Sequence, residues 1–209
     1  MKNYLVEFVG TFFLVLVIGL TVIEPGAGAL APLAIGSTLM VMVYAGGHIS
    51  GGHYNPAVTL AVWMRGKCGA KDVAPYMVSQ ILGGVVAALV VGFCKPNANV
   101  TAASPDVVRA FLVELLFTFA LCYVVLNTAT SKKNSGNSYY GLAIGFTVLA
   151  GAYAGGAISG GAYNPAVAFG ITTMGLSALS NIWIFLVGNF AGAALAATVY
   201  KLANPGEFS

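Results

Sequence analysis

The sequence predicts an all-α membrane protein with six transmembrane helices and two half-helices in an inverted repeat. Hydrophobic residues make up 58% of the chain and charged residues only 7%, whereas a soluble domain averages about 25% charged residues. The apolar residues gather into long segments of the length that crosses a bilayer. One glycine-rich segment also occurs twice, as GGHISGGHYNPAV at 46–58 and GGAISGGAYNPAV at 155–167.

Six apolar segments are long enough, or nearly so, to span the hydrocarbon core as helices. In chain order they are Tyr4–Ile23, Leu30–Ala45, Val73–Phe93, Val107–Leu126, Tyr139–Tyr153 and Ile182–Leu202. The tripeptide Glu24-Pro25-Gly26 separates the first two, as expected of a turn. The polar stretch 131–137 must be a loop between the fourth and fifth.

The two copies of the repeated segment lie in the parts of the chain that these spans leave over, 48–64 and 158–174. Each passes through Asn-Pro-Ala into about ten apolar residues, which as a helix cover about 15 Å, or half a bilayer. Proline suits the first turn of a helix, and asparagine suits the position before it as an N-cap. We therefore predict two half-helices, each entered through non-helical glycine-rich backbone at 46–52 and 155–161. The residues concerned are Asn55, Pro56, Ala57, Asn164, Pro165 and Ala166.

The two halves also begin alike, with LVEFVGTF in the first and LVELLFTF in the second. Because each half has an odd number of spans, the halves must be inverted relative to each other in the membrane. We expect one domain over 1–209, with repeats at about 1–100 and 107–209.

The basic residues predict the orientation, because cytoplasmic loops are enriched in Lys and Arg. Only Lys95 and Arg109 fall on the side away from the termini. The side with the termini carries Lys2, Arg65, Lys67, Lys71, Lys132, Lys133 and Lys201. We therefore expect a multi-pass protein of the cell membrane with both termini in the cytoplasm.

Half-helices that enter from opposite faces bring their N-termini together near the midplane. Each N-terminus carries about half a positive charge from the helix dipole. Asn55 and Asn164 can cap the half-helices and still offer amide N–H groups to a cavity. Such a path favours neutral hydrogen-bonding molecules and opposes cations and protons.

With paired Asn-Pro-Ala motifs, six spans and GHISGGHYNPAVT, the chain resembles the aquaporin or major intrinsic protein family over nearly its whole length. The resemblance extends to YMVSQILGG and WIFLVGNFAGAALA. It implies a passive channel for water and other small neutral solutes, a homotetramer with one pore per subunit, and no cofactor.

The resemblance also implies a selectivity filter toward the outer mouth. By the spacing of the family, its residues are Ile35, Ala152, Gly161 and Val167. The family usually has arginine where this chain has Val167, so the filter is expected to be wide and apolar. Water stays the expected main solute, and passage of glycerol, urea, ammonia or hydrogen peroxide is a hypothesis. The Asp that glycerol channels usually carry is absent, because Ala168 stands at its position.

The acidic and histidine residues near the repeated segments each have a structural and a functional interpretation. An acid inside a span suggests a proton relay by default, but Glu7 and Glu114 fit structural acceptors for the amides of the half-loops better. His48 fits a structural role, and His53 fits the cytoplasmic vestibule, where a pH gate is the alternative. The sequence offers no pattern for a metal site, nucleic-acid binding or an enzyme. A non-conducting membrane protein of structural function and an ion-coupled transporter remain as alternatives.

Overall fold

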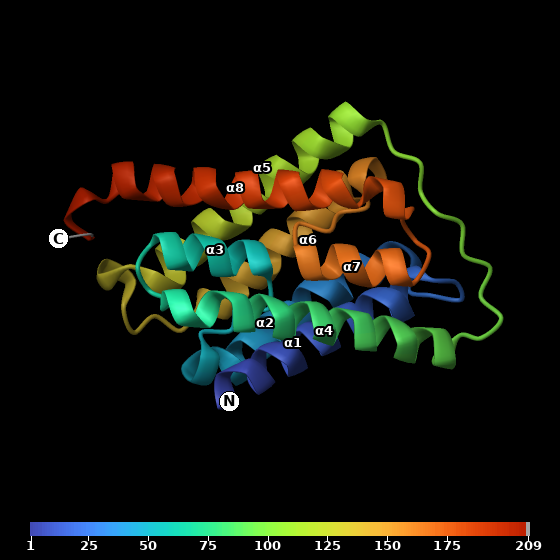
Figure 1. The fold of residues 1–209 in the computed structure, drawn as a ribbon, viewed down its shortest axis with the longest axis horizontal. Coiled ribbons are helices and arrows are strands. Elements are labelled where there is room, and N and C mark those ends of the chain that lie inside the picture. Colours follow the sequence, from blue (N-terminus) through green and yellow to red (C-terminus); the bar gives the residue numbers. More distant parts are fainter. Residues whose placement is uncertain (208–209) are drawn as a thin grey trace.

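The computed structural model describes residues 1–207, which form helices and no strand beyond one isolated bridge between Ala103 and Ser177. Eight α-helices follow one another along the described chain, and Figure 1 shows their arrangement. They are α1 (Lys2–Val22), α2 (Ala31–Ser50), α3 (Pro56–Met64), α4 (Ala70–Cys94), α5 (Val107–Val125), α6 (Tyr140–Ser159), α7 (Pro165–Thr173) and α8 (Ile182–Ala203). Short helical turns lie at Gly28–Leu30, Leu126–Thr130, Lys132–Asn134, Leu179–Asn181 and Pro205–Glu207.

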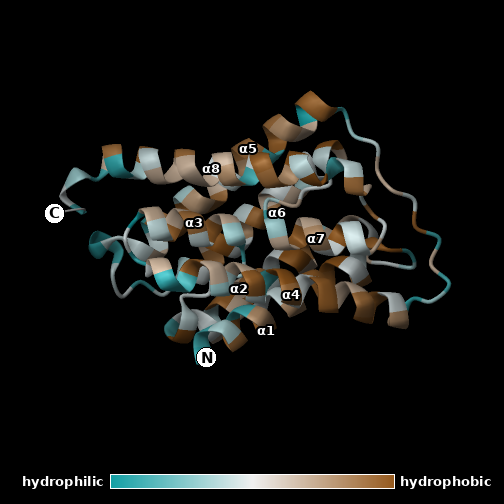
Figure 2. Ribbon diagram, in the orientation of Figure 1, coloured by the Kyte–Doolittle hydropathy of each residue, from teal (hydrophilic) through white to brown (hydrophobic). Residues whose placement is uncertain are grey.

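Six of these helical segments are long and apolar enough to cross a membrane, which confirms the predicted fold class. The other two, α3 and α7, have 9 residues each and reach about half-way through a bilayer. Apolar residues cover the middle of the bundle, whereas hydrophilic residues gather at the ends of helices and in loops (Figure 2). The protein is therefore a multi-pass membrane protein.

Each half of the chain repeats the same order of two spans, a half-helix and a third span. The first span of each half packs on the last, α1 on α4 and α5 on α8, while α2 packs on α6 between the halves. Each half-helix also packs against the last span of the other half, α3 on α8 and α7 on α4. In Figure 1, α3 and α7 lie in the middle of the bundle with the spans around them.

The second and fifth spans are longer than predicted, because α2 continues to Ser50 and α6 to Ser159. The prediction of non-helical backbone over 46–52 and 155–161 is therefore wrong for most of each stretch. Glycine at 46 serves close packing here, since a Cβ there would meet the side chains of Tyr54 and Val6. The helices end instead at Gly51 and Gly160, whose φ angles of 94° and 96° are left-handed and favour glycine.

Candidate functional site

The two half-helices meet through their N-terminal asparagines, which are both N-caps as predicted. The Asn55 Oδ1 accepts from the amides of Ala57 at 2.8 Å and Val58 at 3.4 Å, and the Asn164 Oδ1 accepts from Ala166 at 2.9 Å. These bonds satisfy amides that the first turn of a helix otherwise leaves without a partner.

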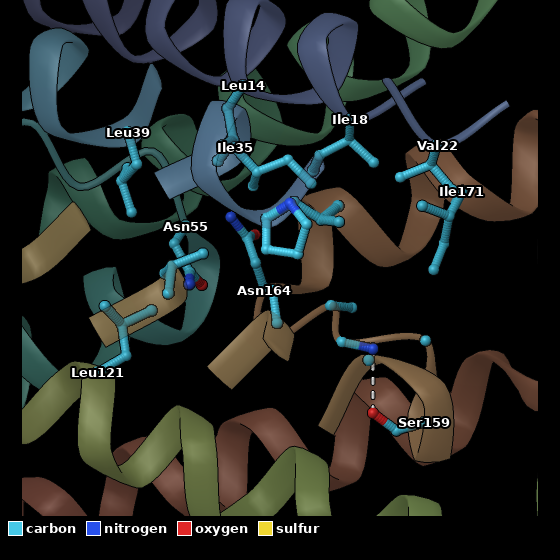
Figure 3. Close-up of a pocket in the computed structure, with 18 of the residues that line it drawn as sticks. Leu14, Ile18, Val22, Ile35, Leu39, Asn55, Leu121, Ser159, Asn164 and Ile171 are labelled. Atoms are coloured by element: carbon cyan, nitrogen blue, oxygen red, sulfur yellow. Dashed lines mark hydrogen bonds between the residues drawn. The ribbon is translucent and has the colours of Figure 1, made fainter. Parts of the chain in front are cut away.

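The asparagine amide nitrogens also form bonds between the two halves, and the sequence pattern does not predict these bonds. The Asn55 Nδ2 donates to the Tyr163 carbonyl and the Asn164 Nδ2 donates to the Tyr54 carbonyl, each at 2.9 Å. A carboxamide nitrogen carries two protons, and this bond uses one. The second N–H of each asparagine is therefore oriented by the first, and both side chains line one cavity (Figure 3).

That cavity, which we call the outer cavity because it reaches the loop between α4 and α5 at the end of the bundle away from the termini (Figure 1), has a volume of about 340 Å³. Much of its lining is aliphatic and comes from α1, α2 and α5, including Leu14, Ile18, Ile35, Leu39 and Leu121 (Figure 3). The polar part of the lining comes from the asparagines and from the backbone that leads into α7. The loop between α4 and α5 completes the cavity with Thr101, Ala103 and Pro105.

The structure brings all four predicted filter residues to the outer cavity. Ile35 is 8% exposed and Val167 is 3% exposed. Ala152 has a side chain of one carbon and Gly161 has no side chain, so both add little bulk to the lining. Among the residues described as lining this cavity there is no Arg, Lys, Asp or Glu. Its polarity therefore comes from amides, hydroxyls, backbone groups and one imidazole.

Glu7 is fully buried and accepts four hydrogen bonds from the first half-loop and its surroundings. Its Oε1 accepts from the Ser50 hydroxyl at 2.6 Å and the His53 amide at 3.0 Å, while its Oε2 accepts from the Tyr54 amide at 2.6 Å and the Gln80 Nε2 at 2.7 Å. The carboxylate thus fixes two successive amides that no helix satisfies.

Glu114 repeats this arrangement in the second half. Its Oε1 accepts from the Ser159 hydroxyl at 2.7 Å and the Ala162 amide at 3.0 Å, and its Oε2 accepts from the Tyr163 amide at 2.7 Å and Asn189 Nδ2 at 2.8 Å. Neither acid is among the residues that line the described cavities. The geometry is that of an acceptor that holds a loop, and it places neither carboxylate on a path through the molecule.

The two tyrosines before the asparagines have left-handed backbone, with φ of 50° at Tyr54 and 48° at Tyr163. This conformation costs a non-glycine residue about 1–2 kcal/mol. The bonds from Glu7 and Glu114 to these amides offset that cost, and so do the tyrosine hydroxyls, which donate to Met42 O at 2.9 Å and Gly151 O at 2.8 Å. The repeated Tyr-Asn-Pro was the only sign of this in the sequence.

A second cavity of about 340 Å³, which we call the inner cavity, lies near the N-terminus, between the end of α3, the start of α4 and the end of α5. Its lining is more polar and includes Asn3, Ser50, Lys67, Cys68, Asp72, Tyr76 and Thr130. His53 and Val125 line both cavities, so they mark where the two adjoin. The His53 Nδ1 lies 3.1 Å from the Thr59 hydroxyl, and the ring lies 5.2 Å from that of Tyr76.

The two histidines near the first Asn-Pro-Ala motif lie in different surroundings. His53 is buried and stands at the junction of the cavities, whereas His48 lies on an exposed side of α2 and is not among the lining residues of either described cavity. A helical position at 48 explains the difference, because α2 continues through it and turns its side chain outward.

Comparisons with known proteins give matches over nearly the whole chain. The sequence matches the family described as major intrinsic protein over residues 1–200. It is 37% identical over 207 residues to the glycerol uptake facilitator protein-like 6 of Lactiplantibacillus plantarum, covering 94% of this chain and 95% of that one. It is 39% identical over 182 residues to aquaporin TIP1-2 of Zea mays, covering 85% and 71%.

The fold is also similar to a solved structure, the aquaglyceroporin from Plasmodium falciparum. The TM-score is 0.79, and the match covers 99% of this chain and 98% of that one at 22% identity. At this identity the likeness concerns the arrangement of the helices.

Proposed function

Because the chain belongs to the major intrinsic protein family and is a passive channel for water and small solutes, we propose that its pore runs through the outer cavity, past Asn55 and Asn164, into the inner cavity. The observation that carries this proposal is the pair of crossed asparagine amides. Each keeps one oriented N–H for a passing molecule while the other N–H holds the opposite half-loop. Both cavities reach His53, which supports one continuous path.

In this pore, α3 and α7 point their positive ends toward the asparagines. The two helix ends and the asparagine N–H groups favour the oxygen of a neutral molecule and oppose a cation or a proton. The aliphatic wall offers no competing hydrogen bond, so a molecule moves along the polar side. The proposed Asn-Pro-Ala residues of the pore are Asn55, Pro56, Ala57, Asn164, Pro165 and Ala166.

We propose Ile35, Ala152, Gly161 and Val167 as the selectivity filter. Their side chains add little bulk and no donor, so size sets the limit there more than chemistry does. Water is the main solute of this proposal, and uncharged molecules of the size of glycerol or urea also pass. A relative of 37% identity that is named a glycerol uptake facilitator protein-like protein supports this extension.

The remaining parts of the proposal concern the whole molecule. The chain is one channel domain with inverted repeats at about 1–100 and 107–209, it has no enzymatic activity, and it assembles as a homotetramer in the cell membrane. The excess of basic residues on the side of the termini supports a cytoplasmic position for both ends. Many apolar side chains on the outside of the spans, such as Leu89 and Leu116, are available to lipid or to neighbouring subunits.

Reconstituted vesicles test the function directly. Vesicles with the protein should shrink faster in hyperosmotic sucrose than protein-free vesicles, and in hyperosmotic glycerol they should shrink and then reswell. Equal shrinkage rates with and without a folded protein would contradict the water pore. Fast shrinkage without faster reswelling would leave the water pore in place and contradict the wide filter.

A further inference from the structure

A short helical turn near the end of the described chain, Pro205–Glu207, binds two separate parts of the inner side. The Glu207 Oε2 lies 2.6 Å from the Arg65 Nη2, and the Glu207 carbonyl accepts from the Arg65 Nη1 at 2.9 Å. The Glu207 Oε1 accepts from the Ser131 hydroxyl and from the Lys132 amide, both at 2.9 Å. One glutamate thus joins residues that lie far apart in the sequence, and we call this set of contacts the clasp.

The two parts that the clasp joins are both walls of the inner cavity. Arg65 is the C-cap of the half-helix α3, and it is followed by Lys67 and Cys68, which line that cavity. Ser131 follows the π-helical turn Leu126–Thr130, whose last two residues line it as well. The clasp therefore connects the inner end of a half-helix to the inner end of the fourth span.

We propose that Glu207 is a positioning residue that holds the inner mouth of the pore at its working width. This inference rests on the proposed function, because it takes the inner cavity as part of the conducting path. Glu207 touches no solute in this proposal. It acts through Arg65 on one wall and through Ser131 and Lys132 on the other.

The burial of the ion pair gives the clasp its effect. The side chains of Arg65 and Glu207 are 4% and 5% exposed, and the Arg65 guanidinium lies over the Tyr200 ring at 5.3 Å from its centre. Removing the carboxylate charge leaves the buried guanidinium with neutral neighbours, such as the Glu207 carbonyl and the Tyr200 ring, so a position nearer to water becomes more favourable for it. For Arg65 the inner cavity beside Lys67 is a nearby source of water, so release of Glu207 moves a bulky cation and its loop toward the mouth.

Cysteine labelling tests this without depending on transport. Cys68 lines the inner cavity next to the Arg65 loop and is half-buried, Cys122 is fully buried, and Cys94 is exposed and can be replaced by serine. In Cys94→Ser vesicles, Glu207→Gln should raise the rate at which a small neutral maleimide modifies Cys68 by at least about fivefold, the lower end of the coupling between linked sites. Cys122 should stay unmodified.

Water permeability is the second readout. If Arg65 and its loop are displaced toward the mouth in about half of the Glu207→Gln molecules, and those molecules conduct no water, water permeability falls about twofold. Glu24→Gln is the matched control, because it makes the same chemical change at an exposed glutamate on the other side of the membrane, and both readouts should stay at parent values. Ser131→Ala removes one bond to Glu207 and keeps the ion pair, so it should shift both readouts in the same direction by a smaller factor.

The proposal is overturned if folded Glu207→Gln matches the parent in both readouts. A faster Cys68 reaction with unchanged or higher water permeability also overturns it, because the mouth would then loosen without effect on flow. If Cys122 becomes reactive as well, Glu207→Gln has loosened the whole bundle, and Ser131→Ala decides: parent values in that variant overturn the clasp. A parent that conducts no water would contradict the proposed function, while Cys68 labelling would still report on the clasp.

Discussion

Replacing Val167 with arginine is the sharpest test of the proposed filter. Val167 is the third residue of α7 and is 3% exposed on the wall of the outer cavity, which Ala152 and Gly161 also line with little or no side-chain bulk. An arginine there fills that space and adds donors that this filter lacks. We expect glycerol permeability to fall about tenfold or more, which corresponds to an added barrier of about 1.4 kcal/mol, and water permeability to stay within about threefold of the parent.

The substitution also has a cost in stability. A charge at membrane depth is unfavourable by about 2.5–3.5 kcal/mol on insertion scales, and by less where a wet cavity is within reach. A cation in the first turn of α7 also opposes the helix dipole by about 0.3–1 kcal/mol. Because Val167 lines the outer cavity, the guanidinium can reach water, and we expect the variant to fold with lowered thermal stability. Its size profile in detergent is therefore measured first.

The assay follows vesicle volume by light scattering, in sucrose for water and in glycerol for solute entry. Val167→Met is the matched control, because it lengthens the side chain without adding donors or charge. If width sets the limit, methionine also lowers glycerol entry. The reasoning is refuted if the parent rejects glycerol and Val167→Arg leaves the ratio of water to glycerol permeability unchanged, since the filter would then lie elsewhere, for example at the loop residues around Ala103.

Three further predictions concern Asn164 in the proposed pore, the buried Glu114 that holds the second half-loop, and Glu207 in the clasp. Asn164→Asp places a carboxylate where two positive helix ends meet, so cation conductance across planar bilayers should rise while the parent shows none; equal conductance in a folded variant would contradict the pore path. Glu114→Gln removes the charge from an acceptor of four hydrogen bonds, and a hydrogen bond to a charged group contributes about 1.5–3 kcal/mol. In detergent the variant should therefore aggregate at a lower temperature than the parent. An unchanged aggregation temperature would contradict the structural role of Glu114. Burial by itself raises the pKa of Glu207, but the bonds from Ser131 and the Lys132 amide, with the Arg65 charge, hold that pKa below its ordinary value. The clasp should then be intact above the usual glutamate pKa of about 4.3 and be lost as the pH falls through the lowered pKa of Glu207. Water permeability should therefore stay flat from neutral pH to about 5 and decline only in stronger acid. The Glu207→Gln variant should not show this decline.

The sequence by itself determined the class of the protein and the positions of its main elements. The near absence of charge and the length of the apolar segments indicate that a bilayer surrounds the protein. In a bilayer the backbone groups of such a segment must be hydrogen-bonded within a helix, so the segments are predicted to be helical. The helix starts at Pro56 and Pro165 were also predictable, because asparagine is a preferred N-cap and proline is favoured in the first turn of the helix that follows. These are local signals, and the structure confirms the helices they predict.

The C-terminal ends of α2 and α6 could not be predicted from the sequence in the same way. Glycine both breaks helices and allows close packing, and only the partner decides between the two. Gly36 and Gly145 let α2 and α6 cross closely, since a Cβ at Gly36 would lie 2.7 Å from the Gly145 carbonyl oxygen. The glycines at 46 and 155 likewise face the tyrosines of their half-loops, and α2 and α6 therefore run past them.

Only the tertiary structure decided the contacts that join distant parts of the chain. The sequence contains Asn55, Tyr163 and Glu207, but the bond from Asn55 to the Tyr163 carbonyl and the bond from Arg65 to Glu207 span more than half the chain. Hydrogen bonds of this kind depend on atoms placed to within a few tenths of an ångström, and periodicity carries no such information. The sequence determines which segments cross the membrane, because burial depends on composition, whereas the shape of the path between them depends on how the folded segments meet.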